Sequence, residues 1–475
     1  MLEKRDFYIG GGWTAPATPK DFAVIDPSTE EQCAVISLGD QADTDAAVAA
    51  ARGSFDGWSQ TSRGEREALL RKLLAIYEDR AEEMAQAMSL EMGAPIELSR
   101  AQQVGAGSWH MKGFLKAFET FSFERDFTAT EKTLLEPIGV CALITPWNWP
   151  MNQIVLKVIP ALATGCTVVL KPSEVAPLSG HLFAEFVHEA GFPAGVFNLV
   201  NGDGAGVGSQ LSAHPGVDMV SFTGSTRAGI AISKAAADTL KRVSLELGGK
   251  GANIIFDDAH PKAAKQGAIR CFRNSGQSCN APTRMLVHRS RYDEAVATAA
   301  EVAEATHVGP ASEEGKHIGP VVSEAQFDKI QKLIETGMGE ARLVAGGLGR
   351  PDGLNRGYYV KPTVFADVTN DMTIAREEIF GPVLSIIPFD EEAEAIAIAN
   401  DTPYGLTNYI QTEDDDKRRR VARQLRSGMV ETNGQGFAQG SPFGGYKQSG
   451  NGREGGTYGL EEFLEVKAVS GWAAE

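Results

Sequence analysis

The chain has 475 residues, of which 43% are hydrophobic and 23% are charged, and its formal net charge is -17. This composition is typical of a folded globular protein with about two to four domains, and it excludes wholesale disorder. An acidic chain with no long basic run is not expected to have nucleic acid or an anionic membrane as its main partner.

Compartment and metal content can also be judged from composition. The N-terminal residues MLEKRDFYIGGGW contain no apolar stretch long enough for a signal peptide. The most apolar stretch, 158–170, is too short to span a bilayer and contains proline and glycine. The five cysteines are widely spaced and never form a C-x-x-C pair, so we expect neither disulfides nor a metal site. A reducing cytoplasm fits this pattern.

Within the first third of the chain, the spacing of apolar residues changes once. Residues 41–118 are expected to be helical, because apolar residues recur at helical spacing, as at Leu69, Leu70, Leu73, Leu74 and Tyr77. From 121 to 129, aromatic residues alternate with polar ones, which predicts a β structure that could form a two-stranded arm. Such a ribbon needs a partner surface. The segment FLEVKAV, 463–469, could pair with it across subunits. An ordinary hairpin covered within one chain fits the pattern equally well.

From 138 to 250 the pattern alternates between strands and helices. Apolar strand candidates lie at 139–145, 166–171, 195–200, 218–224 and 242–247, and helices are expected at 172–191 and 225–240. This alternation predicts a parallel sheet covered on both faces, with ligands at the carboxyl ends of its strands. The glycines of GGKG, 248–251, indicate a hinge, after which a second α/β region runs to about residue 447.

Two segments could bind a dinucleotide phosphate. GDGAGVG, 202–208, does not have G-x-G-x-x-G spacing and is better described as a glycine-rich turn. SFTGSTRAG, 221–229, follows an apolar strand and opens a helix, so the backbone at Gly224 and Ser225 suits a pyrophosphate. A plain helix N-cap explains the same pattern.

LKPSE, 170–174, has the residue types of a ribose site. Lys171 is a donor at a strand end, and Glu174 can accept hydrogen bonds from both ribose hydroxyls. Because a carboxylate would repel a 2′-phosphate, NAD is favoured over NADP. Taken alone, the two residues could also be solvated loop charges.

The same segments, in the same order, resemble motifs of the NAD(P)-dependent aldehyde dehydrogenases. The motifs are PWNWP, LKPSE, FTGST, LELGGK, GQSC, EEIFGPV and PFGGYKQSG. The resemblance covers nearly the whole chain and implies an α/β fold with two Rossmann-like parallel-sheet domains plus a small β oligomerisation arm. It implies an NAD-binding domain (1–118 and 138–248), a catalytic domain (249–447), and an arm with a C-terminal strand (119–137 and 448–475). A homodimer or homotetramer is then expected.

The resemblance also implies roles for individual residues. Cys279 resembles the catalytic nucleophile, Glu246 the general base and Asn148 the oxyanion-hole amide. The matching cofactor positions are Thr145, Pro146, Trp147, Lys171, Ser173, Glu174, Gly204, Phe222, Gly224, Ser225, Leu247, Gly248, Glu378 and Phe380. The matching substrate-tunnel positions are Trp149, Asn152, Gln153, Leu156, Phe437 and Phe443.

The implied chemistry suits these residue types. A thiolate of Cys279 adds to the aldehyde, the thiohemiacetal loses hydride to NAD, and water activated by Glu246 hydrolyses the thioester. The presence of Glu246 favours water over coenzyme A as acceptor. An unrelated cysteine hydrolase would need a histidine base, and none of the eight histidines adjoins these motifs. An esterase side reaction at Cys279 fits the same residues, as does a non-enzymatic relative with a binding or structural role.

The aldehyde itself is left open by the sequence. Asn152 and Gln153 stand where many relatives carry apolar residues, which suggests a polar or medium-sized substrate. No arginine occupies this helix segment, so a carboxylate-bearing semialdehyde is not expected to bind there.

Overall fold

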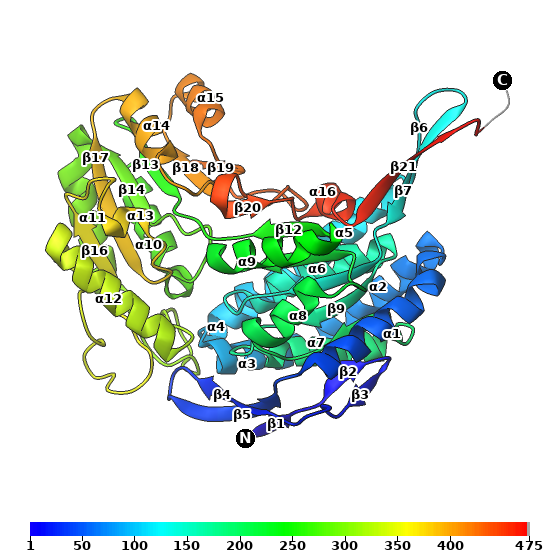
Figure 1. Ribbon diagram of the computed structural model, residues 1–475. Helices are drawn as coiled ribbons and strands as arrows, with labels where there is room; N and C mark the ends of the chain where they lie inside the picture. Colours follow the sequence, from blue (N-terminus) through cyan, green and yellow to red (C-terminus); the bar gives the residue numbers. More distant parts are fainter. Residues whose placement is uncertain (473–475) are drawn as a thin grey trace.

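The chain folds into two α/β units side by side, with a β arm that projects from the first unit (Figure 1). The structure is a computed structural model that describes residues 1–472. The predicted α/β class, with largely parallel sheets, is confirmed. The last three residues of the segment predicted at 448–475 lie outside the described residues. Within residues 1–472, no helix is both long and apolar enough to cross a membrane.

The first unit is built on an eight-stranded sheet with the order β20-β12-β11-β8-β9-β10-β2-β3. Its parallel centre consists of the strands predicted between 138 and 250: β8 (Val140–Ile144), β9 (Thr167–Lys171), β10 (Phe197–Leu199), β11 (Met219–Thr223) and β12 (Arg242–Glu246). Antiparallel edges are added by β2 (Phe7–Ile9), β3 (Gly12–Thr14) and β20 (Gly450–Asn451). All carboxyl ends of the central strands therefore meet at one edge.

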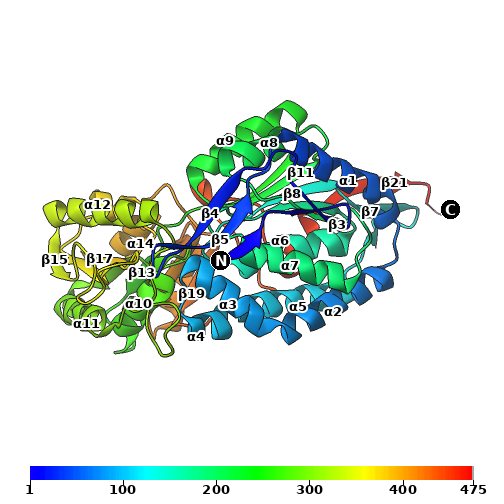
Figure 2. The same ribbon diagram turned by 90° about the horizontal axis from the view of Figure 1, so that it is seen from below.

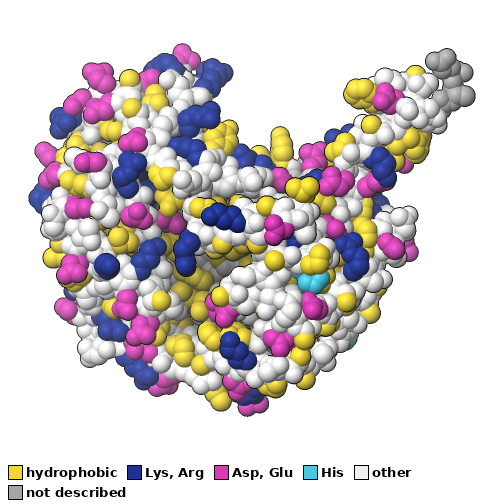
Figure 3. Space-filling model, viewed as in Figure 1, with side chains coloured by type: hydrophobic (Ala, Val, Ile, Leu, Met, Phe, Trp, Pro, Cys, Tyr) yellow, Lys and Arg dark blue, Asp and Glu magenta, His cyan; other side chains and the backbone are white. Residues whose placement is uncertain are grey.

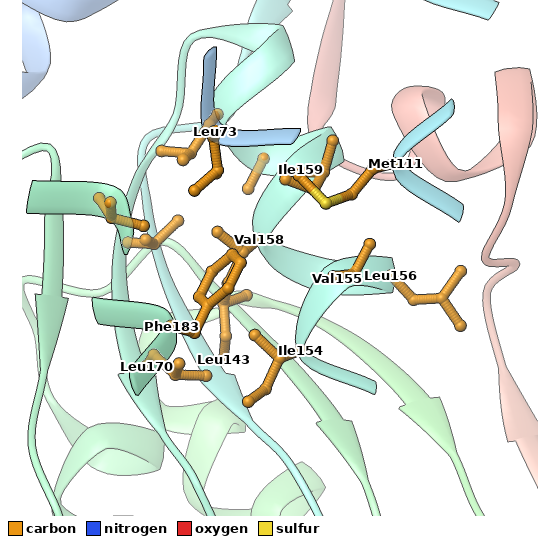
Figure 4. Close-up of a cluster of buried hydrophobic side chains, with 14 of the residues drawn as sticks. Leu73, Met111, Leu143, Ile154, Val155, Leu156, Val158, Ile159, Leu170 and Phe183 are labelled. Atoms are coloured by element: carbon orange, nitrogen blue, oxygen red, sulfur yellow. The ribbon is translucent and has the colours of Figure 1, made fainter. Parts of the chain in front are cut away.

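Apolar residues on both faces of this sheet explain why its strands read as unbroken apolar runs. Cys141 and Leu143 of β8 face one core, which includes side chains of α6 (Pro150–Thr164), α7 (Leu178–Ala190), α2 (Arg63–Asp79) and α5 (Val104–Thr120). Figure 4 shows Ile154 and Val158 of α6 beside Leu143 of the sheet. Val140 and Ala142 face the opposite core, with α1 (Gln41–Ser59), α8 (Ser209–Ala213) and α9 (Thr226–Ala236).

Three local expectations need correction. The helix expected from residue 172 begins only at Leu178, and 172–177 form a loop at the end of β9. The glycine-rich segment contains a helical turn, Gly204–Gly208, that leads into α8. The strand expected over 121–129 is only β6 (Glu124–Asp126). Phe121 instead ends α5, where its ring packs edge to face on Phe123.

The second unit contains a seven-stranded sheet with the order β15-β16-β17-β14-β13-β18-β19. Its strands are β13 (Ala252–Ile255), β14 (Arg284–His288), β15 (Arg342–Ala345), β16 (Thr363–Ala366), β17 (Val383–Phe389), β18 (Thr407–Gln411) and β19 (Met429–Thr432). Its main helices are α10 (Ala263–Phe272), α11 (Tyr292–Ala305), α12 (Glu324–Glu340), α14 (Glu392–Asn400) and α15 (Asp415–Gln424). Residues 248–251 link β12 to β13, so the expected glycine hinge connects the two sheets.

A small sheet near the N-terminus was not anticipated from the sequence. It consists of β1 (Leu2–Lys4), β4 (Asp21–Asp26) and β5 (Glu31–Ser37) in the order β1-β5-β4. In Figure 2 this sheet lies across the first unit. The turn between β4 and β5 reaches the second unit, where the Pro27 carbonyl accepts the N–H of Tyr358 and Glu30 pairs with Arg350 at 2.8 Å. The N-terminal sheet thus ties the two units together.

The arm is a three-stranded sheet of β6, β7 (Glu131–Pro137) and β21 (Leu464–Ser470). β21 runs antiparallel to β7 along its whole length, so the C-terminal strand pairs with the arm of its own chain. The rest of the segment predicted as arm lies elsewhere: β20 joins the first sheet, and α16 (Gly456–Glu461) packs on α5 and α6. The arm leaves Phe127 and Val466 exposed. Domain limits and a dimer or tetramer remain predictions.

Glu91, on α3 (Ala81–Met92), is a buried carboxylate that caps a helix distant in sequence. Its Oε1 accepts the N–H of Ser179 at 3.1 Å and its Oε2 accepts that of Leu178, both at the start of α7. These hydrogen bonds favour the charged form, but burial outweighs them and raises the pKa of Glu91 to about 7.

This raised pKa makes stability depend on pH. Between the ordinary carboxyl pKa and about 7, the folded protein binds the Glu91 proton more tightly than the unfolded chain does, so this group's contribution to stability falls as pH rises. We expect Glu91→Gln to remove this pH dependence. The unfolding free energy of the variant, relative to that of the native protein, should therefore rise by on the order of 2 kcal/mol between about pH 5 and pH 8. Urea unfolding at both pH values measures it. Exposed Glu335→Gln is the control, and parallel pH profiles for native protein and Glu91→Gln would contradict the assignment.

Candidate active site

The sequence motifs meet where the central strands of the first sheet end. Ile144 is in register with both Lys171 and Phe222, and the N–H of Thr145 donates to the Lys171 carbonyl at 3.1 Å. A cavity of about 200 Å³ opens between this edge and the second unit. The space-filling view shows the surface hollowed between the two units (Figure 3). This is the position where parallel α/β sheets bind ligands.

Ten of the 17 catalytic and cofactor residues proposed from the sequence line this cavity. They are Pro146, Trp147, Asn148, Gly224, Ser225, Leu247, Gly248, Cys279, Glu378 and Phe380. Thr223, Gln326 and Lys329 also line it, and the sequence motifs gave no sign of the last two. The remaining cofactor candidates, Thr145, Lys171, Ser173, Glu174, Gly204 and Phe222, lie at or beyond the same strand ends without lining the cavity. Among them, Lys171 donates to Glu174 at 3.1 Å.

Cys279 follows a tightly constrained loop at the end of α10. Asn274 and Ser275 have φ values of 52° and 56°, which are unfavourable for residues with side chains. Side-chain hydrogen bonds hold this conformation: Asn274 donates to the Asn148 carbonyl at 3.0 Å, and Ser275 donates to the Gly319 carbonyl at 2.6 Å. A Cβ at Gly276 would lie 2.0 Å from the Gly381 carbonyl oxygen. The loop can therefore hold the thiol at one position.

The thiol of Cys279 is neutral at rest. Burial raises the pKa of Cys279 well above its usual range, and the nearby carboxylates of Glu378, Glu246 and Glu454 raise it further. A cationic group or fixed donors beside the sulfur are needed before the thiolate can form.

Hydrogen-bond donors lie beside this thiol. The side-chain amide of Asn148 uses one N–H on the Gln277 carbonyl at 3.1 Å, which orients the group. Gln103, on the helical turn before α5, donates to the Asn148 carbonyl at 3.1 Å and fixes the backbone there. Within residues 1–472 the backbone N–H of Cys279 makes no hydrogen bond. The second amide N–H of Asn148 and this N–H are available for an oxyanion.

Glu246, at the end of β12, is buried, and both its carboxylate oxygens lack a hydrogen-bond partner in the described part of the chain. Burial raises its pKa well above the usual range, and the neighbouring Glu454 raises it further, while Lys157 opposes the rise. Lys157 and Glu454 form a buried ion pair beside it. A lysine within the otherwise apolar run 154–163 of α6 was the one sequence signal for this pair.

Glu378 and Phe380 form the opposite wall of the cavity. Glu378 Oε1 accepts the N–H of Gly249 at 2.8 Å, and a Cβ at Gly248 would lie 2.4 Å from the other carboxylate oxygen. From α12, Lys329 donates to the Glu378 carbonyl at 2.8 Å and Gln326 to the Phe380 carbonyl at 2.9 Å. The α12 side chains thus hold Phe380 in a backbone conformation with φ of 58°.

The proposed tunnel residues are spread from the thiol outward. Trp149 Nε1 donates to Ser278 Oγ at 2.8 Å, directly beside Cys279. Asn152 is half-buried. Gln153 and Leu156 are buried, and Leu156 belongs to the core between α5 and α6 (Figure 4). Phe443 is half-buried and Phe437 is exposed. Their shared role in a tunnel remains a prediction.

Comparison with known proteins gives concordant matches. The model of the aldehyde dehydrogenase family matches residues 13–469. A 3-succinoylsemialdehyde-pyridine dehydrogenase from Pseudomonas sp is 52% identical over 99% of both chains. The crystal structure of an aldehyde dehydrogenase from Bartonella henselae has a TM-score of 0.99 at 60% identity, covering 99% of this chain and 100% of that one. A cysteine-to-alanine mutant of aldehyde dehydrogenase C from Pseudomonas syringae, complexed with NAD+ and octanal, has a TM-score of 0.98 at 50% identity, covering 99% and 97%.

Proposed function

Because the chain belongs to the aldehyde dehydrogenase family, whose members oxidise aldehydes to carboxylic acids, we propose that it does so with NAD, using Cys279 as nucleophile and Glu246 as general base. The observation that carries the proposal is the convergence of Cys279, Asn148 and the Gly224 strand end on one cavity. No histidine lines this cavity among the described residues, which speaks against a cysteine hydrolase.

The residues present fit a dinucleotide. The buried hydroxyls of Thr145 and Thr223 lack partners within the described chain, and Gly224 precedes Ser225, the N-cap of α9, whose N-terminal amides suit a pyrophosphate. Glu174 and Lys171 would hold a ribose, and the Glu174 carboxylate favours NAD over NADP. Glu378 and Phe380 would hold the nicotinamide end. When bound, NAD supplies a cationic ring that accepts hydride and favours the thiolate of Cys279.

The first half of the reaction depends on Cys279 and its donors. The Cys279 sulfur adds to the carbonyl carbon while the thiol proton passes to water, and a C–S bond replaces the C=O π bond. The resulting oxyanion receives hydrogen bonds from the Asn148 amide and the Cys279 backbone N–H. Loss of hydride from the tetrahedral carbon restores the carbonyl as a thioester, so the aldehyde is oxidised by two electrons.

The second half depends on Glu246. Its carboxylate takes a proton from water as the water oxygen attacks the thioester, and the C–S bond breaks to release the acid and the Cys279 thiolate. A carboxylate with a raised pKa and no hydrogen-bond partner is suited to this proton transfer. Because a water acceptor needs such a base, the presence of Glu246 supports hydrolysis over acyl transfer to coenzyme A.

The names of similar proteins indicate which classes of aldehyde to test. The relatives' names mention octanal and a pyridine-bearing semialdehyde, so aliphatic and aromatic aldehydes both belong in a test panel. We infer a homodimer or homotetramer of cytoplasmic location, because the arm leaves Phe127 and Val466 exposed and the cysteines suit a reducing compartment.

We expect the native protein to form NADH from NAD with at least one aldehyde of a panel containing aliphatic, aromatic and heteroaromatic members. The absorbance of NADH measures the rate, and chromatography should detect the acid in equal amount. NADP is tested in parallel and should support a lower rate because of Glu174. Absence of turnover with every aldehyde and both cofactors would contradict the proposed function.

A further inference from the structure

A polar cluster of the second unit lies behind the segment that contains Cys279. Tyr409 of β18 and Glu431 of β19 are register partners in neighbouring parallel strands, so their side chains lie on the same face of the sheet. Arg270 of α10 covers this face, with its guanidinium carbon 4.6 Å from the centroid of the Tyr409 ring. The three residues come from three separate elements, and no sequence motif singled them out.

Arg270 and Glu431 form a bidentate ion pair. Arg270 Nη2 donates to Glu431 Oε2 at 2.7 Å, and Nη1 donates to Oε1. The Glu431 side chain is 2% exposed and that of Arg270 is 35% exposed, so the carboxylate needs this partner. Bidentate pairing fixes the plane of the guanidinium, and the same cation lies over the face of the Tyr409 ring. The ion pair therefore holds the tyrosine ring in one orientation.

The Tyr409 hydroxyl reaches the backbone beside the nucleophile. It donates to the carbonyl of Asn280, the residue after Cys279, and within residues 1–472 no other group donates to that carbonyl. Burial raises the pKa of Tyr409 above its usual range, so the hydroxyl keeps its proton and remains a donor. Residues 277–283 belong to no helix or strand. The position of Asn280 is therefore set by a side-chain contact rather than by regular structure.

Asn280 in turn contacts the sulfur. Burial raises the pKa of the Cys279 thiol, and a hydrogen bond from the backbone N–H of Asn280 opposes this rise. A fixed donor on the sulfur favours the thiolate. The N–H and the carbonyl of Asn280 are separated by only two soft dihedral angles, so a shift of the carbonyl also moves the N–H.

We infer that Tyr409 is a positioning residue that keeps the Asn280 N–H on the Cys279 sulfur and thereby favours the reactive thiolate. Arg270 and Glu431 act through Tyr409 by holding its ring. The use of this thiolate in aldehyde oxidation rests on the proposed function, but its formation needs no aldehyde. Its reactivity can therefore be measured apart from turnover.

Alkylation of Cys279 by iodoacetamide reports the thiolate, because the thiolate is the attacking form. Mass spectrometry of the peptide that contains Cys279 gives the rate from about pH 6 to pH 10 with NAD present. Tyr409→Phe removes only the hydroxyl, and we expect alkylation near pH 7 to slow about threefold to tenfold as the profile moves to higher pH. The other carboxylates that face the thiol are unchanged in the variant; they are Glu246, Glu378 and Glu454.

A loosened fold would give the opposite result. Cys271 follows Arg270 on α10 and is buried, so loosening of this region would speed the alkylation of both Cys271 and Cys279. Tyr359→Phe is the matched control, because it removes another buried hydroxyl that donates to a backbone carbonyl, that of Ser28 at 3.1 Å. It should leave the Cys279 profile at its native position.

A second variant tests the ion pair. Arg270→Met combined with Glu431→Leu removes both charges together, so that no buried carboxylate is left unpaired. We expect this double variant to slow the alkylation of Cys279 in the same direction as Tyr409→Phe. The triple variant should be no slower than Tyr409→Phe alone, because the ion pair acts through the hydroxyl.

The outcomes separate the inference from the proposed function. A Cys279 profile that stays native in Tyr409→Phe or in the double variant would overturn the inference. Faster alkylation of Cys271 and Cys279 together, or additive slowing in the triple variant, would also overturn it. Absence of aldehyde turnover by the native protein would instead contradict the proposed function, whatever the alkylation profiles show.

Discussion

Replacing Cys279 with alanine is expected to lower kcat/KM for aldehydes by at least about 10⁴-fold, since a missing nucleophile cannot be replaced by its neighbours. Among the described residues that line the cavity, Cys279 is the only cysteine. The other cysteines lie elsewhere: Cys141, Cys166 and Cys271 are buried in the cores, and Cys33 is in the N-terminal sheet. The loss should therefore appear with every aldehyde that the native protein oxidises.

NAD binding should survive this substitution. The cofactor candidates Gly224, Ser225 and Glu378 come from other segments than the Cys279 loop, and that loop is held by Asn274 and Ser275 rather than by the thiol. We expect the Kd for NAD, measured by fluorescence titration, to stay within about threefold of the native value. Cys33→Ser is the matched control and should keep full turnover. Activity of Cys279→Ala within about tenfold of native would rule out the thioester route.

The parts of the site that could be predicted from the sequence are those that follow single strands. Lys171 and Glu246 end apolar strands, Gly224 comes directly after one, and Asn148 lies four residues beyond another; parallel strands bring such ends together at one edge. Cys279 could be proposed because the GQSC segment that contains it resembles a family motif. Local pattern was enough for Lys171 and Gly224, because strand register places them, whereas Asn148 and Glu246 were assigned through the family resemblance.

The parts that could not be predicted depend on contacts between distant segments. Gln326 and Lys329 reach the cavity only because α12 packs beside the segment that contains Glu378. The pairing of Lys157 with Glu454 joins α6 to a C-terminal loop, and no periodicity reports such a contact. The same limit applies to the N-terminal sheet, whose short strands are only partly apolar.

The arm shows how one contact settles an ambiguity in the pattern. FLEVKAV was compatible with pairing across subunits or within the chain, because strand pattern gives no partner. In the structure, Val466 is in register with Leu135 and Val469 with Lys132 of the same chain. A second subunit could then cover the exposed surface of a sheet that one chain forms by itself.

Replacing Glu246 with glutamine is expected to separate the two halves of the reaction. Gln keeps the shape of the side chain but cannot take a proton from water, so steady-state kcat should fall about 10²–10⁴-fold. Formation of the thioester does not need this base in the proposed route. Stopped-flow mixing with NAD and a good aldehyde should therefore still show a burst of about one NADH per active site.

The pH dependence provides an independent test of the same assignment. A general base acts only when deprotonated, so native kcat should rise with pH through the raised pKa of Glu246. Glu454 raises that pKa and Lys157 lowers it, so Glu454→Gln should move the rise in kcat to lower pH while the burst is retained. An unmoved profile would mean that the titration seen in kcat belongs to another group. A Glu246→Gln burst reduced as much as turnover would mean that Glu246 acts before hydride transfer. The base for hydrolysis would then have to be another group.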